Sequence, residues 1–234
     1  MLKAVLFDFN GVIINDESIH NALIEQLMIE ENLRLKPGEF REVCLGRSDR
    51  ACLVELFNRR GRILDESGLL KLLKRKAKAY QNFLDSMETL PLYQGLGELL
   101  SQLQDAQLKL AVVSGAMRSE IELVLTRAGL ISFFDAIVAG DDILTSKPEP
   151  DGYLLAIQRL NQLYPDFHLQ GAECLAIEDT LAGIQAAHNG GIPVLGVAHT
   201  YPLHILQRWA TWSVDTFGDI ELERLQNFFL QDVA

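Results

Sequence analysis

The chain has 234 residues, and 21 Lys and Arg against 32 Asp and Glu give a formal net charge of −11 at pH 7. This balance disfavours nucleic acid and anionic membranes as partners, because both are bound through clustered basic side chains. Hydrophobic residues make up 48% of the chain, a usual share for a globular protein, and no apolar run approaches the ~20 residues of a membrane span. The apolar opening is too short for a secretory signal and carries an early Asp, so we expect a cytoplasmic protein.

The first predicted element is a strand at residues 3–7, which is apolar throughout, as in strands that are covered on both faces. No strand is predicted between about residues 15 and 88, where apolar spacing near 3.6 indicates helices at 19–31, 50–60 and 69–84. This helical stretch is too long for a simple crossover between parallel strands. We therefore predict a helical cap domain over residues 15–88, inserted into a core domain of residues 1–14 and 89–234.

Helices and strands alternate after residue 88. Helices are predicted at 97–104, 119–128, 152–163 and 181–188, and strands at 109–113, 135–139, 174–177 and 193–197. Asp151 is the expected N-cap of the third helix, and Gly129 and Gly190 are expected C-terminal stops. A strand at 213–215 and a helix at 220–229 are predicted at the end. Such alternation predicts an α/β fold, with a Rossmann-like parallel sheet between two layers of helices.

The three cysteines are Cys44, Cys52 and Cys174, and none of them lies in a CxxC motif. Three cysteines cannot all pair within one chain, and thiols stay reduced in the cytoplasm. We therefore expect each one to be a small apolar side chain with a free thiol.

Polar residues follow four of the predicted strands, at the sheet edge where open parallel sheets bind ligands. In chain order they are Asp8 and Asn10, then Ser114 and Gly115, then Lys147 in the loop beyond Asp141 and Asp142, and finally Glu178 and Asp179. Charge at a buried strand end is costly unless it is paired or bound to a metal ion. The set suits phosphoryl transfer, which uses a carboxylate nucleophile, Mg²⁺, a fixed ammonium group and donors to phosphate oxygens.

Other common chemistries lack their motifs in this sequence. There is no G-x-x-x-x-G-K-[ST] of a P-loop, no G-x-G-x-x-G after the first strand and no G-x-S-x-G elbow. The five histidines also lack the spacing of zinc ligands. Phosphoryl transfer therefore remains the favoured chemistry.

At this point the chain resembles a known family, the haloacid dehalogenase superfamily, in its subgroup with a helical cap after the first motif. The matching segments are Asp8-Phe9-Asn10-Gly11-Val12, Val112-Val113-Ser114-Gly115, Lys147-Pro148-Glu149-Pro150-Asp151 and Glu178-Asp179-Thr180 with Gly183-Ile184. Four motifs in this order cover essentially the whole chain. Within the superfamily the sequence is similar to β-phosphoglucomutases and phosphoglycolate phosphatase-like hydrolases.

The resemblance implies a Mg²⁺-dependent phosphohydrolase that forms an aspartyl-phosphate on a small phosphorylated metabolite, such as a sugar phosphate. It makes Asp8 the nucleophile, and Ser114, Gly115 and Lys147 the phosphate-binding groups. Its metal ligands would be Asp8, the backbone carbonyl of Asn10, Glu178 and Asp179. The cap would select the substrate through His20, Gly46, Arg47, Ser48, Arg50 and Lys76. We take a monomer as the default state.

One residue departs from the family pattern. Asn10 stands where the family has the Asp that acts as general acid and base, and an amide does not titrate near neutral pH. General acid–base help is typically worth ~10²–10⁴-fold in rate. The related phosphonatases use a cap lysine as a Schiff base, a role for which Lys36 or Lys76 could be proposed, but neither has a supporting pattern.

Three interpretations stay open at the sequence level. The chain is a phosphatase weakened on poor leaving groups, a pseudo-enzyme that binds a phosphorylated ligand, or a β-phosphoglucomutase-like phosphotransferase in which Asn10 was engineered.

Overall fold

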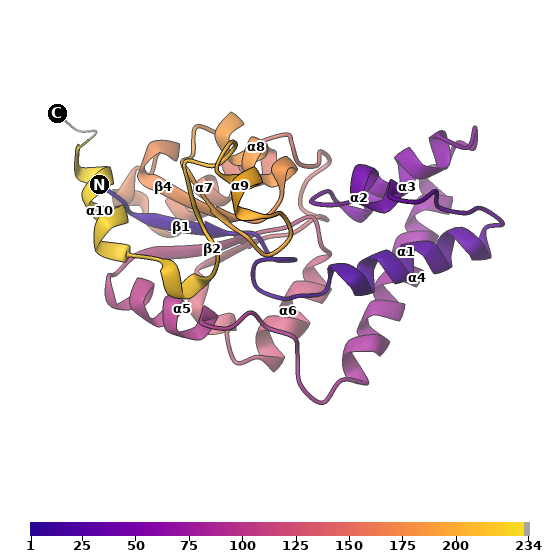
Figure 1. The fold of residues 1–234 in the computed structure, drawn as a ribbon, viewed down its shortest axis with the longest axis horizontal. Coiled ribbons are helices and arrows are strands. Elements are labelled where there is room, and N and C mark those ends of the chain that lie inside the picture. The colour runs from indigo at the N-terminus through magenta and orange to yellow at the C-terminus, as the bar shows by residue number, and fades with distance from the viewer. Residues whose placement is uncertain (232–234) are drawn as a thin grey trace.

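A six-stranded sheet forms the centre of the protein, which is known here from a computed structural model describing residues 1–231 (Figure 1). The strands are β1 (Ala4–Phe7), β2 (Lys109–Val113), β3 (Ala136–Val138), β4 (Cys174–Glu178), β5 (Val194–Val197) and β6 (Trp212–Val214). Their order is β3-β2-β1-β4-β5-β6, and every neighbouring pair is parallel. The predicted Rossmann-like α/β fold is therefore confirmed.

Helices cover both faces of this sheet. One face carries α5 (Leu96–Asp105), α6 (Arg118–Arg127) and α10 (Leu222–Gln231), whose apolar residues share a cluster with side chains of β1 and β2. The other face carries α7 (Asp151–Leu163), α8 (Leu181–Asn189) and α9 (Leu203–Leu206). The central strands are buried on both sides, as their unbroken apolar sequences predicted.

The remaining helices form a separate body beside one edge of the core (Figure 1). They are α1 (Glu17–Glu30), α2 (Glu39–Val43), α3 (Asp49–Asn58) and α4 (Glu66–Asp85). Their buried apolar residues make a cluster of their own, distinct from the two clusters that flank the sheet. A second core of this kind supports a helical domain inserted after β1, although its boundaries at residues 15 and 88 stay a prediction. Within residues 1–231 no helix combines the length and the apolar character that a membrane crossing needs.

Two sequence expectations on local structure were wrong. Asp151 is the first residue of α7, and Pro150 occupies the N-cap position, because the turn of the Lys-Pro-Glu-Pro segment runs directly into the helix. Cys44 and Cys52 form a disulfide, although each was expected as a free thiol; only Cys174 is free and buried. Cys52 lies in the first turn of α3, which packs beside the end of α2 where Cys44 lies. A spacing of eight residues in the sequence does not by itself predict this contact.

Candidate active site

The register of the sheet places the polar ends of three strands at one edge. Phe7 of β1 pairs with Val112 of β2 on one side and with Ile177 of β4 on the other. The three strands therefore end within one or two residues of the same level. Asp8, Ser114, Glu178 and Asp179 meet there, and the loop after β3 brings Lys147 to the same place.

Lys147 links two of the carboxylates at this edge. Its Nζ lies 2.8 Å from Oδ1 of Asp8 and 2.6 Å from Oε1 of Glu178. Tyr153 of α7 donates a hydrogen bond from its hydroxyl to the same Glu178 oxygen, at 2.6 Å. All four side chains are buried, so each charge depends on these partners rather than on water.

Asp179 is the charge without a partner. It is 0% exposed, and within residues 1–231 neither carboxylate oxygen has a partner at full hydrogen-bond geometry; the Thr200 side chain is only near enough to oppose the rise of its pKa. One ligand atom each from Asp8, Glu178 and Asp179 can be chosen so that all three lie within 4.8 Å of one another. Oxygen donors around an uncompensated negative charge are what Mg²⁺ binds in proteins, so the residues fit a divalent cation.

The pKa directions at this cluster agree with that reading. Burial and the neighbouring charge of Glu178 raise the pKa of Asp8 from 3.8 to about 8, against the opposing effect of Lys147. Burial, followed by the charges of Asp8 and Glu178, raises the pKa of Asp179 well above its usual range. Carboxylates that repel each other in this way hold protons in the absence of a cation and release them to one that binds.

Glycines bring the backbone close to the same carboxylates. Gly11 has a φ of +78°, and a Cβ atom built there would lie 2.0 Å from Oδ2 of Asp179. A Cβ at Gly183 of α8 would lie 2.0 Å from Glu178 Oε1. Both positions of the family motifs therefore need glycine because larger residues would displace the acidic cluster.

The predicted phosphate-binding loop follows β2. Ser114 is 2% exposed, and its hydroxyl accepts a hydrogen bond from the N–H of Ala116 at 3.0 Å. Gly115 and Ala116 line the pocket that contains Asp8 and Lys147, whereas Ser114 lines an adjoining one with Lys147. The loop thus presents its backbone next to Asp8, with the Ser114 side chain bound to its own turn.

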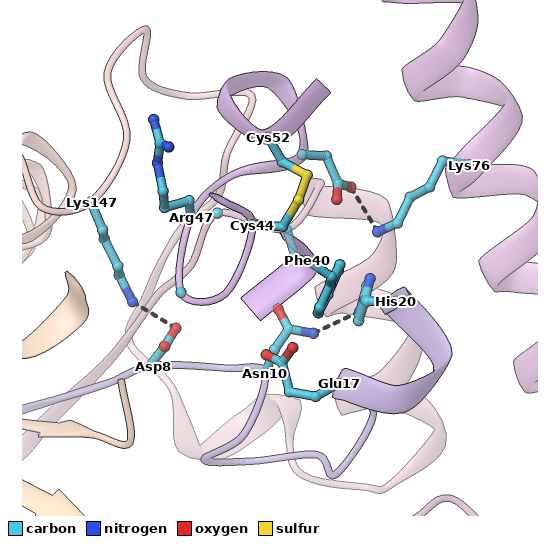
Figure 2. Close-up of a pocket in the computed structure, with 14 residues that line it drawn as sticks. Asp8, Asn10, Glu17, His20, Phe40, Cys44, Arg47, Cys52, Lys76 and Lys147 are labelled. Carbon is cyan, nitrogen blue, oxygen red and sulfur yellow. Dashed lines mark hydrogen bonds and ion pairs between the residues drawn. A yellow bond between two sulfur atoms is a disulfide. The ribbon is translucent and has the colours of Figure 1, made fainter. Parts of the chain in front are cut away.

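Residues of the helical segment complete the pocket above Asp8 (Figure 2). Of the six predicted substrate contacts there, the structure brings four to it: His20, Gly46, Arg47 and Lys76. Ser48 instead caps α3 and donates its backbone N–H to Ser146 Oγ of the core, at 2.8 Å. Arg50 lies on the outer side of α3, where it forms an ion pair with Glu66 at 2.7 Å, outside the pocket lining.

Three carboxylates at or beside the pocket were not predicted from the sequence: Asp49, Glu120 and Glu17. Nζ of the buried Lys76 lies 2.6 Å from Asp49 Oδ2 and 3.5 Å from Glu120 Oε1, so its charge is already balanced. Glu17 is half-buried in the lining and forms no ion pair within residues 1–231, and burial raises its pKa. No local motif distinguishes these carboxylates from the many on solvent-exposed helix faces.

Asp16 was missed as well, and it contacts Asn10. The Asn10 amide nitrogen donates to both carboxylate oxygens of Asp16, at 3.1 and 3.0 Å. Tyr80 donates its hydroxyl to Asp16 Oδ2 at 2.5 Å, and His20 Nε2 lies 3.1 Å from the same oxygen. Burial alone would lower the pKa of His20, but the Asp16 carboxylate raises it overall, and the pKa of Asp16 is lowered in return.

Comparisons with known proteins agree with this geometry. The sequence model of a family described as haloacid dehalogenase-like hydrolase matches residues 5–197. Validoxylamine A 7′-phosphate phosphatase of Streptomyces hygroscopicus subsp. limoneus is 28% identical over 206 residues, which cover 88% of this chain and 90% of the relative. β-Phosphoglucomutase of Bacillus subtilis (strain 168) is 30% identical over 210 residues, 86% of each chain. A crystal structure of β-phosphoglucomutase from Clostridium difficile has a TM-score of 0.86 at 20% identity and covers 100% of this chain and 99% of its own.

Proposed function

The chain belongs to the haloacid dehalogenase-like hydrolases, and on that premise we propose that it is a phosphatase that releases phosphate from a small phosphorylated metabolite of the sugar-phosphate class. The observation that carries the proposal is the buried set of Asp8, Lys147, Glu178 and the unpartnered Asp179 at the end of the sheet. Relatives that carry the names of a validoxylamine phosphate phosphatase and a β-phosphoglucomutase support a phosphorylated sugar-like substrate.

In the proposed reaction a carboxylate oxygen of Asp8 attacks the phosphorus, and the bond from phosphorus to the leaving-group oxygen breaks. Lys147, 2.8 Å from Asp8, balances the negative charge of the group in transfer, and the backbone of Gly115 and Ala116 lies beside it. The oxygen of a water molecule then bonds to the phosphorus as the bond from phosphorus to Asp8 breaks, which regenerates the Asp8 carboxylate and releases inorganic phosphate with both hydrogens of the water. Asp8, Glu178, Asp179 and the carbonyl of Asn10 are the proposed holders of Mg²⁺, which supplies charge neutralisation for phosphate and favours ionised Asp8.

Asn10 sets the expected substrate preference. The leaving oxygen of an alkyl phosphate, such as a hexose phosphate, needs a proton as its bond breaks, and the amide of Asn10 cannot deliver one. Aryl and acyl phosphates have leaving groups that depart as anions. We therefore expect faster turnover of these compounds than of hexose phosphates.

The charges of the helical segment bear on the choice between a phosphatase and a phosphotransferase. An enzyme that moves a phosphoryl group within one sugar must hold a second phosphate away from Asp8. Lys76 and Arg47 are the two cations of this segment in the lining, and Asp49 and Glu120 already balance the charge of Lys76. Arg47 donates a hydrogen bond to the carbonyl oxygen of Val43 at 3.2 Å and forms no ion pair within residues 1–231, so a second phosphate would depend on Arg47 alone.

The test is phosphate release with Mg²⁺ from an aryl phosphate, an acyl phosphate, phosphoglycolate and hexose phosphates, with Asp8→Asn as the matched variant. We expect release that Asp8→Asn abolishes, and a phosphorylated protein detectable by intact mass after rapid quench. Asn10 itself favours a second candidate, a pseudo-enzyme that binds a phosphorylated ligand. That candidate requires binding of a phosphorylated ligand by both proteins, with release by neither.

A further inference from the structure

The contact between Asn10 and Asp16 is unusual because a buried carboxylate is paired mainly with uncharged donors. Asp16 is 0% exposed and lies just before α1, where the chain passes from the core into the helical segment. Within residues 1–231 its carboxylate receives no Lys or Arg, and its partners are the Asn10 amide, the Tyr80 hydroxyl and the His20 ring. A buried carboxylate surrounded by donors in this way is rigidly held, because any rotation would leave a donor unpaired.

This arrangement fixes the side chain of Asn10 in one orientation. Both oxygens of Asp16 can only accept hydrogen bonds, so the Asn10 group that faces them must be its NH₂. The Asn10 oxygen is on the other branch of the amide and is therefore directed away from Asp16. Figure 2 shows the Asn10 nitrogen on the side of His20 and the oxygen on the opposite side. Nε2 of His20 lies 3.0 Å from the same amide nitrogen and 3.1 Å from Asp16 Oδ2, so the three side chains form one hydrogen-bonded cluster.

We propose that Asp16 is a positioning residue for Asn10, and that the two form a matched pair with the carboxylate at residue 16 and the amide at residue 10. Their hydrogen bonds require one donor and one acceptor across a distance of about 3 Å. A carboxylate at residue 10 would face the carboxylate of Asp16 at this distance, and the two could form a hydrogen bond only if one of them took up a proton, which costs free energy at neutral pH. The pair therefore tolerates an exchange of the two residue types but not a second carboxylate.

The pairing also bears on the origin of Asn10. If the amide at residue 10 had been engineered in place of a carboxylate, the parent protein would have held two carboxylates in hydrogen-bond contact inside the fold. Asn10 instead satisfies Asp16 through its amide group, which donates to both carboxylate oxygens. The pair of Asn10 and Asp16, and not Asn10 alone, is therefore the unit that the experiment has to vary.

The catalytic part of this inference rests on the proposed phosphatase function, whereas the pairing itself does not. The experiment uses four proteins: the unchanged chain, Asn10→Asp, Asp16→Asn, and the exchange variant that carries both. Thermal unfolding is measured for each one, together with kcat/KM on a hexose phosphate and on an aryl phosphate. Asp105→Asn, at an exposed position of α5, combined with Asn10→Asp is the matched control for loss of one negative charge.

We expect each single variant to lower the Tm and the exchange variant to recover most of the loss, while Asp105→Asn recovers none. On the hexose phosphate, Asn10→Asp alone should change kcat/KM by less than about threefold, and the exchange should raise it about tenfold or more, toward the ~10²–10⁴-fold of general acid–base help. The aryl phosphate should respond little, because its leaving group needs no proton.

Additive changes in Tm across the four proteins would overturn the pairing. A full gain in hexose phosphate turnover from Asn10→Asp alone, unchanged by Asp16→Asn, would overturn the positioning role. Absence of turnover in all four proteins would instead refute the proposed phosphatase, and the Tm comparison would still decide whether the two residues are coupled.

Discussion

Replacement of Asp179 by Asn should have opposite effects on stability in the absence and in the presence of Mg²⁺. Lys147 pairs with Asp8 and Glu178 and leaves Asp179 uncompensated, with the three carboxylates within 4.8 Å of one another. Two unit negative charges at this separation repel by roughly 3 kcal/mol at an effective dielectric constant of about 20. The metal-free protein relieves part of this repulsion by retaining protons, since burial and its neighbours raise the pKa of Asp179.

Part of the repulsion should remain in the metal-free protein, so Asp179→Asn should be more stable by about 1–2 kcal/mol, a Tm higher by roughly 2–8 °C at this chain length. Mg²⁺ at about 100 times its Kd should stabilise the unchanged protein by about 2.7 kcal/mol, or roughly 5–10 °C. The variant should respond little, so the order of the two Tm values reverses.

The assay is thermal unfolding with a chelator and then with increasing Mg²⁺, and Asp105→Asn serves as the exposed control. Because burial and Glu178 raise the pKa of Asp8 from 3.8 to about 8, the folded metal-free protein keeps a proton there that the unfolded chain releases. Its stability should therefore fall as the pH rises from about 4 to 8, and the effect of Mg²⁺ should grow over the same interval. Equal Mg²⁺ shifts in both proteins, or none in the unchanged one, would refute this account of the cluster.

Three further outcomes follow from individual contacts. Burial alone would raise the pKa of Asp142, but two arginines and a backbone N–H lower it to about 2. The stability of the unchanged protein should therefore fall as the pH drops from about 5 to 2, and in Asp142→Asn this loss should be smaller by about 2 kcal/mol, as acid unfolding curves would show. Gly183→Ala, whose Cβ would strike Glu178, should lose about 1–3 kcal/mol and the Mg²⁺ response in thermal unfolding. Alkylation of the denatured, unreduced protein should modify one cysteine, and all three after reduction of Cys44–Cys52.

The sheet was predictable because its signals are local and redundant. Five of the six strands are short, continuous apolar runs, and each core helix longer than one turn follows a regular spacing of apolar residues. The polar strand ends needed only the rule that parallel strands end at a common edge. The short helices α2 and α9 were missed, because five and four residues carry too little periodicity to be recognised.

The helical part of the pocket was less predictable, because its contacts depend on which side of each helix faces inward. Arg50 and Asp49 are adjacent in α3, yet Asp49 reaches Lys76 inside the pocket and Arg50 pairs with Glu66 outside it. Adjacent helical residues are about 100° apart around the helix axis. If the start of a helix is uncertain by one residue, the sequence does not predict which of two neighbours faces the pocket. The disulfide was missed for a related reason, since it closes only after α2 and α3 have packed together.

Asn10 shows why a motif residue has to be judged together with its neighbours in space. In the sequence it stands for a lost carboxylate, and the expected consequence is simply a slower enzyme. In the fold the turn at Gly11 brings residue 16 back against residue 10, and a carboxylate is present there after all. The negative charge near residue 10 is thus carried by Asp16, which is hydrogen-bonded to the Asn10 amide. In the proposed reaction Asn10 therefore offers an oriented hydrogen-bond acceptor and no proton, and we expect faster turnover of substrates whose leaving groups need no proton.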